Sequence, residues 1–320
     1  MPAISASAPG KIILFGEHAV VYYRPAIAVP VLQVSTRAMI VADPQAPPHT
    51  VWIDAPQIGM YSKLEDLDPR HPFHLVFRLV MEKLNISQFP SARIKITSSI
   101  PIASGMGSSS AASVALTRVI SEFLGRPFPD EAVNQVAFET EKIFHGHPSG
   151  IDNTVITFAR PVFFVKDQPM EWLKVGAPLT LVIGDSGEAS STAAMVSDLR
   201  QRWSADTARY EQIFNQVEDC TLQARTAIEK GQLSDVGRLM SQNHVLLQEM
   251  DVSSDKLDLL VKSAHDAGAL GAKMSGGGHG GNMVALAESE NQAQVITEAL
   301  KSAGATNVLI TTVPVSGGNQ

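Results

Sequence analysis

The sequence has very little cysteine and no cluster of positive charge. Cys220 is the only cysteine among 320 residues, so no disulfide can form within the chain, which suits a reducing compartment. The formal net charge is −7, and Lys and Arg never form a run longer than a pair. The broad basic face that neutralises a nucleic-acid backbone is therefore missing, and we expect no nucleic-acid partner.

Long apolar stretches are also lacking. None approaches the roughly 20 residues that cross a bilayer, and Lys11 lies inside the first apolar run rather than before it. We therefore expect no signal peptide, no membrane partner and a cytoplasmic location. Hydrophobic residues make up 44% and charged residues 18% of the chain, a globular balance, and the length allows two domains or one large one.

The pattern along the chain predicts an α+β protein. Short β-branched runs at residues 11–15, 26–31 and 34–41 predict strands, and the alternation at 91–98 predicts another. Helical spacing then dominates, with further strands expected. The expected later elements are helices over 108–124, 129–144, 205–230, 233–250, 254–267 and 289–302, and strands over 179–187, 270–274, 282–287 and 306–313.

The segment PIASGMGSSSAAS predicts a glycine turn that leads into a helix. Backbone N–H groups at such a helix start bind anions, and Gly105 and Gly107 leave them unobstructed. The hydroxyls of Ser108, Ser109 and Ser110 are oxygen donors suited to Mg²⁺ beside a phosphate. A helix with a tight N-terminal turn and no ligand explains the same pattern.

A second candidate is the run Glu139, Glu141, His145, His147 and Asp152. Carboxylates and imidazoles at this spacing allow a zinc site, although the H-E-x-x-H arrangement is absent. Asp152 follows Gly, Pro and Ser residues, so we place it in a loop as a general base or hydroxyl-orienting carboxylate. A purely structural capping role is the alternative.

Two further segments carry unusual residues. Gly276, Gly278 and Gly281 formally match G-x-G-x-x-G, but a strand follows, so a Rossmann site is excluded and a glycine hairpin close to a ligand, or a merely permissive turn, remains. Lys11 opens an apolar strand that turns at Glu17-His18. This lysine either lies on the wet face or, near Asp152, stabilises transferred negative charge.

In this order and spacing, the segments resemble the GHMP small-molecule kinases over nearly the whole chain. PIASGMGSSSA is similar to the family's phosphate loop P-x-x-x-G-L-G-S-S-A, SAPGKIILFGEHAVVY to its N-terminal motif, and KMSGGGHGGNMVAL to its C-terminal glycine motif. HGHPSGIDN resembles the H-G-N-P-S-G-[VI]-D-N of the branch that phosphorylates mevalonate.

The resemblance implies a two-domain fold with the site in a cleft between the domains. Residues 1–175 would form an ATP-binding domain like ribosomal protein S5 domain 2, with the phosphate loop, and residues 176–320 a ferredoxin-like C-terminal GHMP kinase domain. It further implies ATP and Mg²⁺ as cofactors and mevalonate as the small-molecule substrate, phosphorylated to mevalonate 5-phosphate in isoprenoid biosynthesis. A homodimer is compatible with it.

The same resemblance implies residue roles. Asp152 would be the catalytic carboxylate with Lys11 as its cationic neighbour, and Ser109 and Glu141 would hold Mg²⁺. The residues implied to bind ATP are Pro101, Ser104, Gly105, Met106, Gly107, Ser108, Ser109 and Ser110. The residues implied to face the acceptor are Glu17, His18, Ser149, Gly150, Thr192 and Gly277.

Some alternatives and departures from the family pattern stay open. Phosphomevalonate, the 3-hydroxyl of mevalonate or a sugar would be the acceptor of another GHMP kinase, and a non-catalytic relative is expected to have lost the catalytic residues, which are all present. His279 interrupts the glycine run, His147 replaces an Asn, and Tyr23 stands where the family often has Gly.

Overall fold

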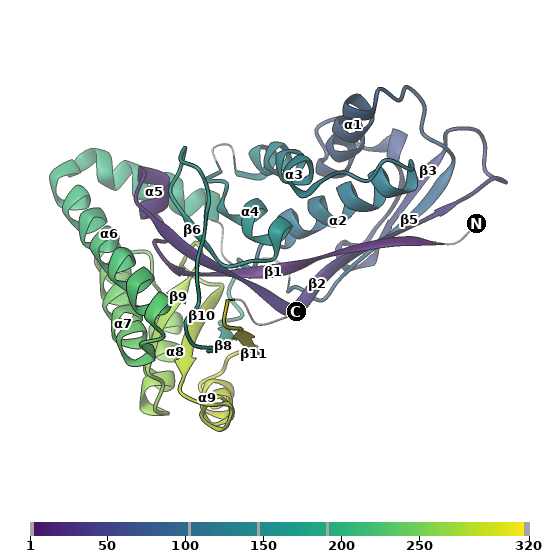
Figure 1. Ribbon diagram of the computed structural model, residues 1–320. Helices are drawn as coiled ribbons and strands as arrows, with labels where there is room; N and C mark the ends of the chain where they lie inside the picture. Colours follow the sequence, from purple (N-terminus) through teal and green to yellow (C-terminus); the bar gives the residue numbers. More distant parts are fainter. Residues whose placement is uncertain (1–2, 102–103, 146–147, 190–191, 317–320) are drawn as a thin grey trace. The chain divides into compact units, whose positions relative to one another are not determined.

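The computed structural model describes residues 3–101, 104–145, 148–189 and 192–316, which fall into two compact units (Figure 1). The segments of unit 1 are Met1–Gly10, Val31–Pro101 and Gly107–Ala159, and those of unit 2 are Lys11–Pro30, Ile102–Met106 and Arg160–Gln320. The chain crosses between the units within β1 (Ile4–Phe15) and β2 (Ala26–Ala42). The domain boundary expected near residue 175 stays a prediction.

Unit 1 contains a mixed sheet in the order β4-β3-β5-β2. The bounds of the first three strands are β4 Met60–Lys63, β3 Val51–Ala55 and β5 Ala92–Ser98. Strands β3 and β5 are parallel, with α1 (Pro72–Leu84) in the connection between them, whereas β5 pairs antiparallel with residues 36–42 of β2. A parallel pair needs such a crossover connection, usually a helix.

The α-helices of unit 1 gather on one side of its strands (Figure 1). Besides α1 they are α2 (Ser108–Phe123), α3 (Asp130–His145) and α4 (Ile151–Phe158). Helix α2 is the central one, in contact with α1, α3, α4 and β5. Its small residues Ala111 and Ala115 are fully buried, which lets the neighbouring helices approach closely.

Unit 2 is built on an antiparallel sheet in the order β11-β8-β10-β9. The bounds are β8 Leu179–Asp185, β9 Gly271–Ser275, β10 Asn282–Ala287 and β11 Asn307–Val313. With a helix before β9 and another before β11, this order is that of the ferredoxin-like βαββαβ arrangement. The short strand β6 (Val162–Phe164) pairs with residues 26–28 of β2 and with β7 (Glu171–Trp172).

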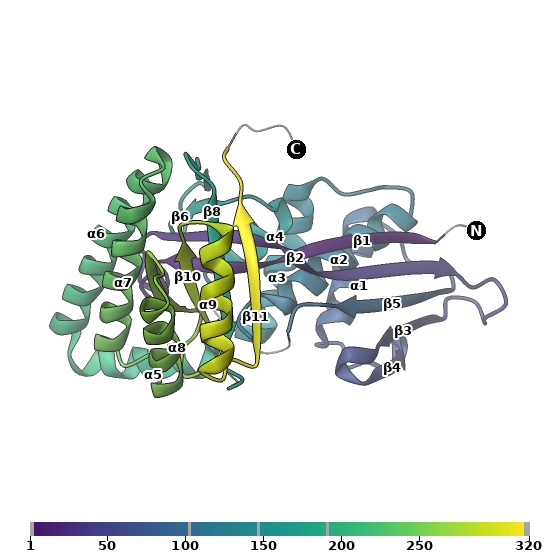
Figure 2. The ribbon, with the colours of Figure 1, turned by 90° about the horizontal axis from the view of Figure 1, so that it is seen from below.

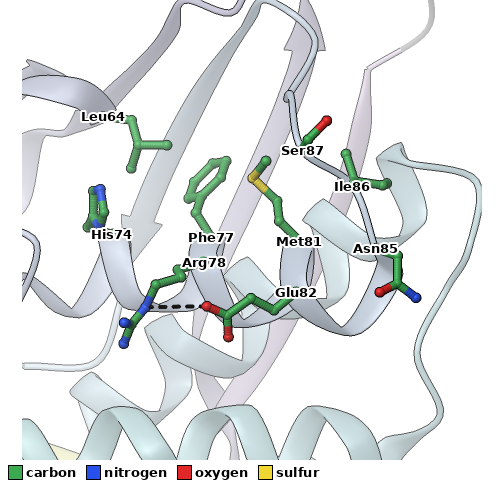
Figure 3. A pocket seen from close by; sticks show the side chains of 9 residues that line it. All are labelled: Leu64, His74, Phe77, Arg78, Met81, Glu82, Asn85, Ile86 and Ser87. Atoms are coloured by element: carbon green, nitrogen blue, oxygen red, sulfur yellow. Dashed lines mark ion pairs between the residues drawn. The ribbon is translucent and has the colours of Figure 1, made fainter.

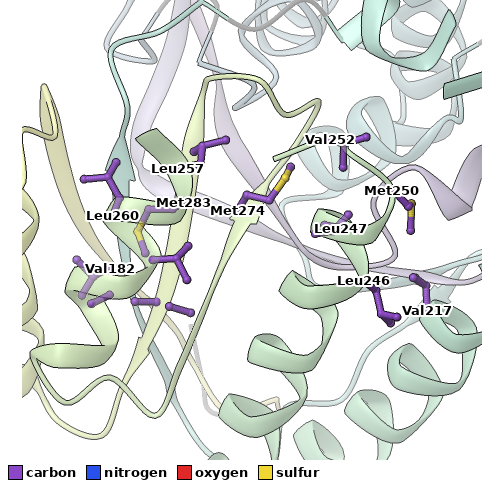
Figure 4. Close-up of a cluster of buried hydrophobic side chains, with 14 of the residues drawn as sticks. Val182, Val217, Leu246, Leu247, Met250, Val252, Leu257, Leu260, Met274 and Met283 are labelled. Atoms are coloured by element: carbon purple, nitrogen blue, oxygen red, sulfur yellow. The ribbon is translucent and has the colours of Figure 1, made fainter. Parts of the chain in front are cut away.

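The helices of unit 2 lie next to its sheet and to one another (Figure 2). They are α5 Thr192–Ala205, α6 Thr207–Lys230, α7 Leu233–Glu249, α8 Asp255–Asp266 and α9 Glu290–Ser302. Ser254 and Ser289 cap α8 and α9 by accepting hydrogen bonds from Leu257 N and Gln292 N, as N-cap serines typically do. Apolar side chains from α6, α7, α8 and the sheet form the core cluster in Figure 4, where Leu247 and Met274 are fully buried.

The structure corrects three expectations. The strands expected at residues 26–31 and 34–41 are one strand, β2; its Pro30 lies between the stretches paired with β6 and β5. Asp152 lies in the first turn of α4 rather than in a loop, because Gly150 is the helix N-cap. Residues 42–90, for which no element was expected, contain α1, β3 and β4. In the described part of the chain, no helix is both long and apolar enough to cross a membrane.

One buried histidine ties helix α7 to the sheet of unit 2. His244 Nδ1 accepts a hydrogen bond from Met274 N at 3.3 Å, and His244 Nε2 lies 3.2 Å from Asp258 Oδ1. Because Nδ1 is an acceptor here, the proton of the neutral ring belongs on Nε2. Burial lowers the pKa of His244 to about 4 from its usual 6.5.

We therefore expect the unfolding free energy to rise with pH between about 4 and 6.5. In this window the unfolded chain binds a proton that His244 in the folded protein does not, so stability is fully present above pH 6.5 and is lost as pH falls; the contribution is at most about 3 kcal/mol. Urea unfolding at pH values within this window and above it measures the change in unfolding free energy. His244→Asn keeps an acceptor for Met274 N and should reduce this slope, leaving the part contributed by His18, whose pKa burial also lowers to about 4; an unchanged slope would contradict the assignment.

Candidate active site

The start of α2 in unit 1 offers hydrogen-bond donors of the kind that bind anions. Gly107 is the helix N-cap, in the left-handed region at φ 75°, and the N–H groups of the first turn have no partner within the helix by its geometry. Ser110 is fully buried, and its Oγ has no hydrogen-bond partner among the residues that the structure describes. Together with the positive end of the helix dipole, these N–H and O–H donors would favour a bound phosphate.

Ser109 and Glu141 come together in unit 1. Ser109 Oγ, in the first turn of α2, donates a hydrogen bond to Glu141 Oε1 of α3 at 2.9 Å, and Glu141 is only 2% exposed. No group of three or more His, Cys, Asp or Glu side chains that could hold a metal occurs in the described part of the chain. The zinc alternative therefore gains no support there, and His147 lies outside the described residues. Two hard oxygen donors suit Mg²⁺ rather than zinc.

Asp152 is held at the second position of α4. Gly150 begins the helix with φ 92°, and its carbonyl accepts a hydrogen bond from Thr154 Oγ1 at 2.7 Å. Asn153 Nδ2 donates to Asn134 Oδ1 of α3 at 2.6 Å, which fixes α4 against its neighbour. The half-buried Asp152 thus lies in the first turn of α4, at the positive end of the helix dipole. Ser149 Oγ accepts from Ile151 N at 3.4 Å in the same turn.

Lys11 belongs to unit 2 and is buried, at 4% exposure, so the wet-face alternative is wrong. Its backbone N–H donates to Met106 O at 3.1 Å, which places β1 against the beginning of the phosphate loop. The carbonyl of Ser104, in the same loop, accepts from Asn282 Nδ2 at 2.5 Å. The N-terminal motif, the loop and the C-terminal glycine motif therefore meet in this unit.

Glu17 and His18 are also buried in unit 2. Glu17 forms an ion pair with Lys273 of β9, and His18 Nε2 lies 3.0 Å from Gly277 O. The carbonyl can only accept, so His18 carries its proton on Nε2 and presents Nδ1 as an acceptor. Burial lowers the pKa of His18 to about 4, so the ring is neutral at pH 7. Sequence analysis missed Lys273, although a lysine within the apolar run ALGAKM was a signal.

The second glycine motif is a hairpin between β9 and β10, so the expectation that a strand and not a helix follows the glycines is confirmed. A Cβ at Gly278 would lie 1.8 Å from Val252 O, which only glycine avoids, and one at Gly276 would be 3.9 Å from Gly105 O. His279 takes φ 49° and is exposed, with its Nε2 3.1 Å from Asp251 O. The histidine that interrupts the glycine run thus turns towards the connection after α7, and Gly276 keeps the approach to the phosphate loop.

The remaining predicted residues lie at element ends. Thr192 begins α5, Pro101 follows β5, and both are half-buried. Tyr23 ends the short 3₁₀ helix Ala19–Tyr22 with φ 65°, the left-handed conformation that glycine would take in that turn. Asp152 and Lys11 belong to different units, and their pairing stays a prediction.

A pocket elsewhere in unit 1 contains none of these residues. It lies along α1, with a cavity volume of about 630 Å³, and Phe77 and Met81 provide apolar lining beside the ion pair of Arg78 and Glu82 (Figure 3). His74 also lines it. This cavity therefore does not mark the candidate active site.

The sequence is similar to GHMP kinases along most of its length. Two family models, "GHMP kinases N terminal domain" and "GHMP kinases C terminal", match residues 73–160 and 224–306. The mevalonate kinase of Thermococcus sibiricus is 34% identical over 319 residues, with 94% of this chain and 93% of that protein covered. The mevalonate kinase of Pyrococcus abyssi is also 34% identical, with 96% and 94% covered.

The fold is also similar to that of a mevalonate kinase of known structure. The crystal structure of L. major mevalonate kinase in complex with R-mevalonate is similar to this chain with a TM-score of 0.85 and 30% sequence identity. The similarity covers 98% of this chain and 97% of that one. The predicted two-domain α+β fold is thereby confirmed.

Proposed function

This chain belongs to the GHMP kinases and, within them, to the mevalonate kinases, and we propose that it transfers the γ-phosphoryl group of ATP to the primary hydroxyl of mevalonate. The products are ADP and mevalonate 5-phosphate. The observation that carries the proposal is the similarity, along nearly the whole chain, to a structure that holds R-mevalonate. The partly buried oxygen pair of Ser109 and Glu141, at the helix start that we propose binds phosphate, supports the same reaction.

ATP is the phosphate donor of this kinase type, and the phosphate loop is our candidate for its binding. The N–H groups of Ser108, Ser109 and Ser110 would receive phosphate oxygens at the start of α2. An added Cβ at Gly105 would meet no atom within 4 Å, so this position leaves open space next to the loop backbone. The carbonyls of Ser104 and Met106 already accept hydrogen bonds from Asn282 and Lys11. These two residues would therefore bind ATP through their backbone N–H groups.

Ser109 and Glu141 fit Mg²⁺ as its two protein ligands. Both groups present hard oxygen atoms, the ligands that Mg²⁺ prefers, and Ser109 Oγ and Glu141 Oε1 already lie 2.9 Å apart. Their hydrogen bond keeps both groups in this arrangement. Mg²⁺ commonly takes one or two protein oxygens, waters and substrate phosphates, and when bound it neutralises charge on the phosphates.

The protein's remaining task is to handle the acceptor hydroxyl. As the hydroxyl oxygen attacks the γ-phosphorus, the bond from phosphorus to the β,γ-bridging oxygen breaks, and Asp152 would take the hydroxyl proton. Lys11 would stabilise the negative charge that develops on the attacking oxygen. Glu17, His18, Ser149, Gly150, Thr192 and Gly277 would face the rest of the acceptor. Positioning and charge neutralisation provide most of the catalysis in such reactions.

We expect ADP release with ATP and mevalonate. The same assay with phosphomevalonate, galactose and homoserine should give little turnover, because the HGHPSGIDN and GEHAVV segments match the mevalonate branch. Release of ADP with another acceptor but not with mevalonate would overturn the substrate assignment. ATP binding without turnover on any acceptor would instead indicate a non-catalytic relative.

Ser109→Ala and Glu141→Gln should each raise the Mg²⁺ concentration needed for half-maximal rate and lower kcat. Each removes an oxygen ligand from a hard cation. Ser113→Ala, one turn later on α2, and Glu139→Gln, on the exposed face of α3 beside Lys142, are matched controls. A variant whose Mg²⁺ dependence equals that of its control would take that residue out of the metal site.

Asp152→Asn should lower kcat by about 10²–10⁴-fold, the usual loss for a general base, while ATP binding survives. Lys11→Met keeps the aliphatic stem and should also act mainly on kcat. If both serve one hydroxyl, the double variant loses much less than the product of the single losses. Steady-state kinetics of the four proteins tests this, and multiplicative losses would assign the two residues separate roles.

A further inference from the structure

The turn that carries Glu17 and His18 has a strained backbone. His18 takes φ 62° and ψ −49°, and the Glu17 carbonyl accepts a hydrogen bond from Ala19 N at 2.7 Å. This is the geometry of the uncommon γ-turn with positive φ at its centre, which costs a residue other than glycine on the order of 1–3 kcal/mol. Such a conformation persists only where the surroundings hold it.

Gly16, the residue before the turn, is packed closely against the backbone of Pro25 and Ala26. Gly16 has φ 88°, and a Cβ there would lie 2.3 Å from Pro25 O. A second hydrogen bond, from Val20 N to Gly16 O at 3.1 Å, spans the turn. The backbone from residue 16 to residue 20 is thus closely confined on this side.

Strand β9 holds the other side of the turn. Its residues alternate between two faces: Ala272 and Met274 belong to the apolar core of unit 2, while Lys273 and Ser275 face the end of β1. Lys273 pairs with Glu17, and its Nζ also donates to Met274 O at 2.6 Å. Ser275 Oγ accepts from Ile13 N at 3.2 Å and donates to Ile13 O at 2.8 Å.

The pair of Lys273 and Glu17 is removed from water, with 0% and 1% of the side chains exposed. Burial raises the pKa of Glu17 and lowers that of Lys273, and their mutual attraction opposes both shifts. A buried pair of this kind adds little net stability compared with apolar residues of similar volume, whereas removal of one partner is costly. Its clear geometric effect is to fix where Glu17, and with it His18, is placed.

Two buried atoms of the turn have acceptor capacity left over. Glu17 Oε2 and His18 Nδ1 have no hydrogen-bond partner among the residues that the structure describes. Buried acceptors without a donor are costly, and a hydroxyl of a ligand would satisfy them. The turn is therefore built to meet a hydroxylated ligand, provided that its strained backbone is maintained.

We infer that Lys273 is a positioning residue for the acceptor side of the site: through Glu17 it holds the strained turn at His18 in the conformation that meets the hydroxylated substrate. This inference rests on the proposed function. Lys273 does not touch the substrate, and its effect reaches the substrate through Glu17 and through the hydrogen bond from His18 to Gly277.

Lys273→Met should raise KM for mevalonate about ten- to a hundredfold, the loss that follows when a substrate contact moves by about an ångström. The Kd for ATP, measured by calorimetry, should stay within the error of the wild-type value. Lys273→Arg keeps the charge and should recover part of the loss. Lys256→Met is the matched control, because Lys256 on α8 also donates to a backbone carbonyl, that of Ala303, at 3.0 Å.

The double variant Glu17→Gln with Lys273→Met separates positioning from mere stability. It leaves no unpaired buried charge, so its Tm should exceed that of Lys273→Met, yet its KM for mevalonate should stay as high as that of the worse single variant. If the KM for mevalonate returns to normal along with the Tm, the inference is overturned. If Lys273→Met does not fold, the double variant provides the test.

Hydrogen exchange distinguishes this inference from the proposed function. The amides of Ala19 and Val20 donate within the turn, and both should exchange faster in Lys273→Met than in Lys256→Met. A wild-type protein that does not phosphorylate mevalonate defeats the proposed function, whatever the exchange rates are. Unchanged exchange at Ala19 and Val20 in a folded Lys273→Met protein defeats the inference, whatever the substrate is.

Discussion

The buried contact between Lys273 and Glu17 is the constraint on which the turn proposed to face the acceptor depends. The two residues lie 256 positions apart, and their contact joins the turn after β1 to the strand before the glycine hairpin. Because that turn carries a strained histidine, its shape is determined by packing and pairing and not by local preference. The same strand binds the end of β1 through Ser275.

The glycine hairpin connects this turn to the phosphate loop. Gly277 accepts the hydrogen bond from His18, Asn282 binds the carbonyl of Ser104, and Gly276 approaches Gly105. The hairpin can take this shape because four of its glycines have positive φ, a backbone conformation that glycine adopts without strain. One short hairpin thus contacts a segment proposed to bind the acceptor and a segment proposed to bind ATP. The oxygen pair proposed for Mg²⁺ is set independently, by the packing of α2 on α3 in unit 1.

The features that could be predicted are the local ones. A glycine and serine turn before small apolar residues at helical spacing predicts the start of α2, because glycine backbone freedom and helix periodicity are properties of a few neighbouring residues. Asp152 was misplaced because Pro148 and Gly150 indicate a loop, whereas Gly150 begins a helix. The pairing of Lys273 with Glu17 could not be predicted, since no periodicity relates residues so far apart, and a lysine in a strand is usually solvated.

The central claim is that the primary hydroxyl of mevalonate receives the phosphoryl group. Phosphorus NMR of the purified product, recorded with proton coupling, tests it most directly. A phosphate on the primary hydroxyl is attached to a CH₂ group, so the account predicts a phosphorus signal split into a triplet by the two methylene protons. A phosphate on the tertiary 3-hydroxyl has no proton on the attached carbon, so an unsplit signal would contradict the account.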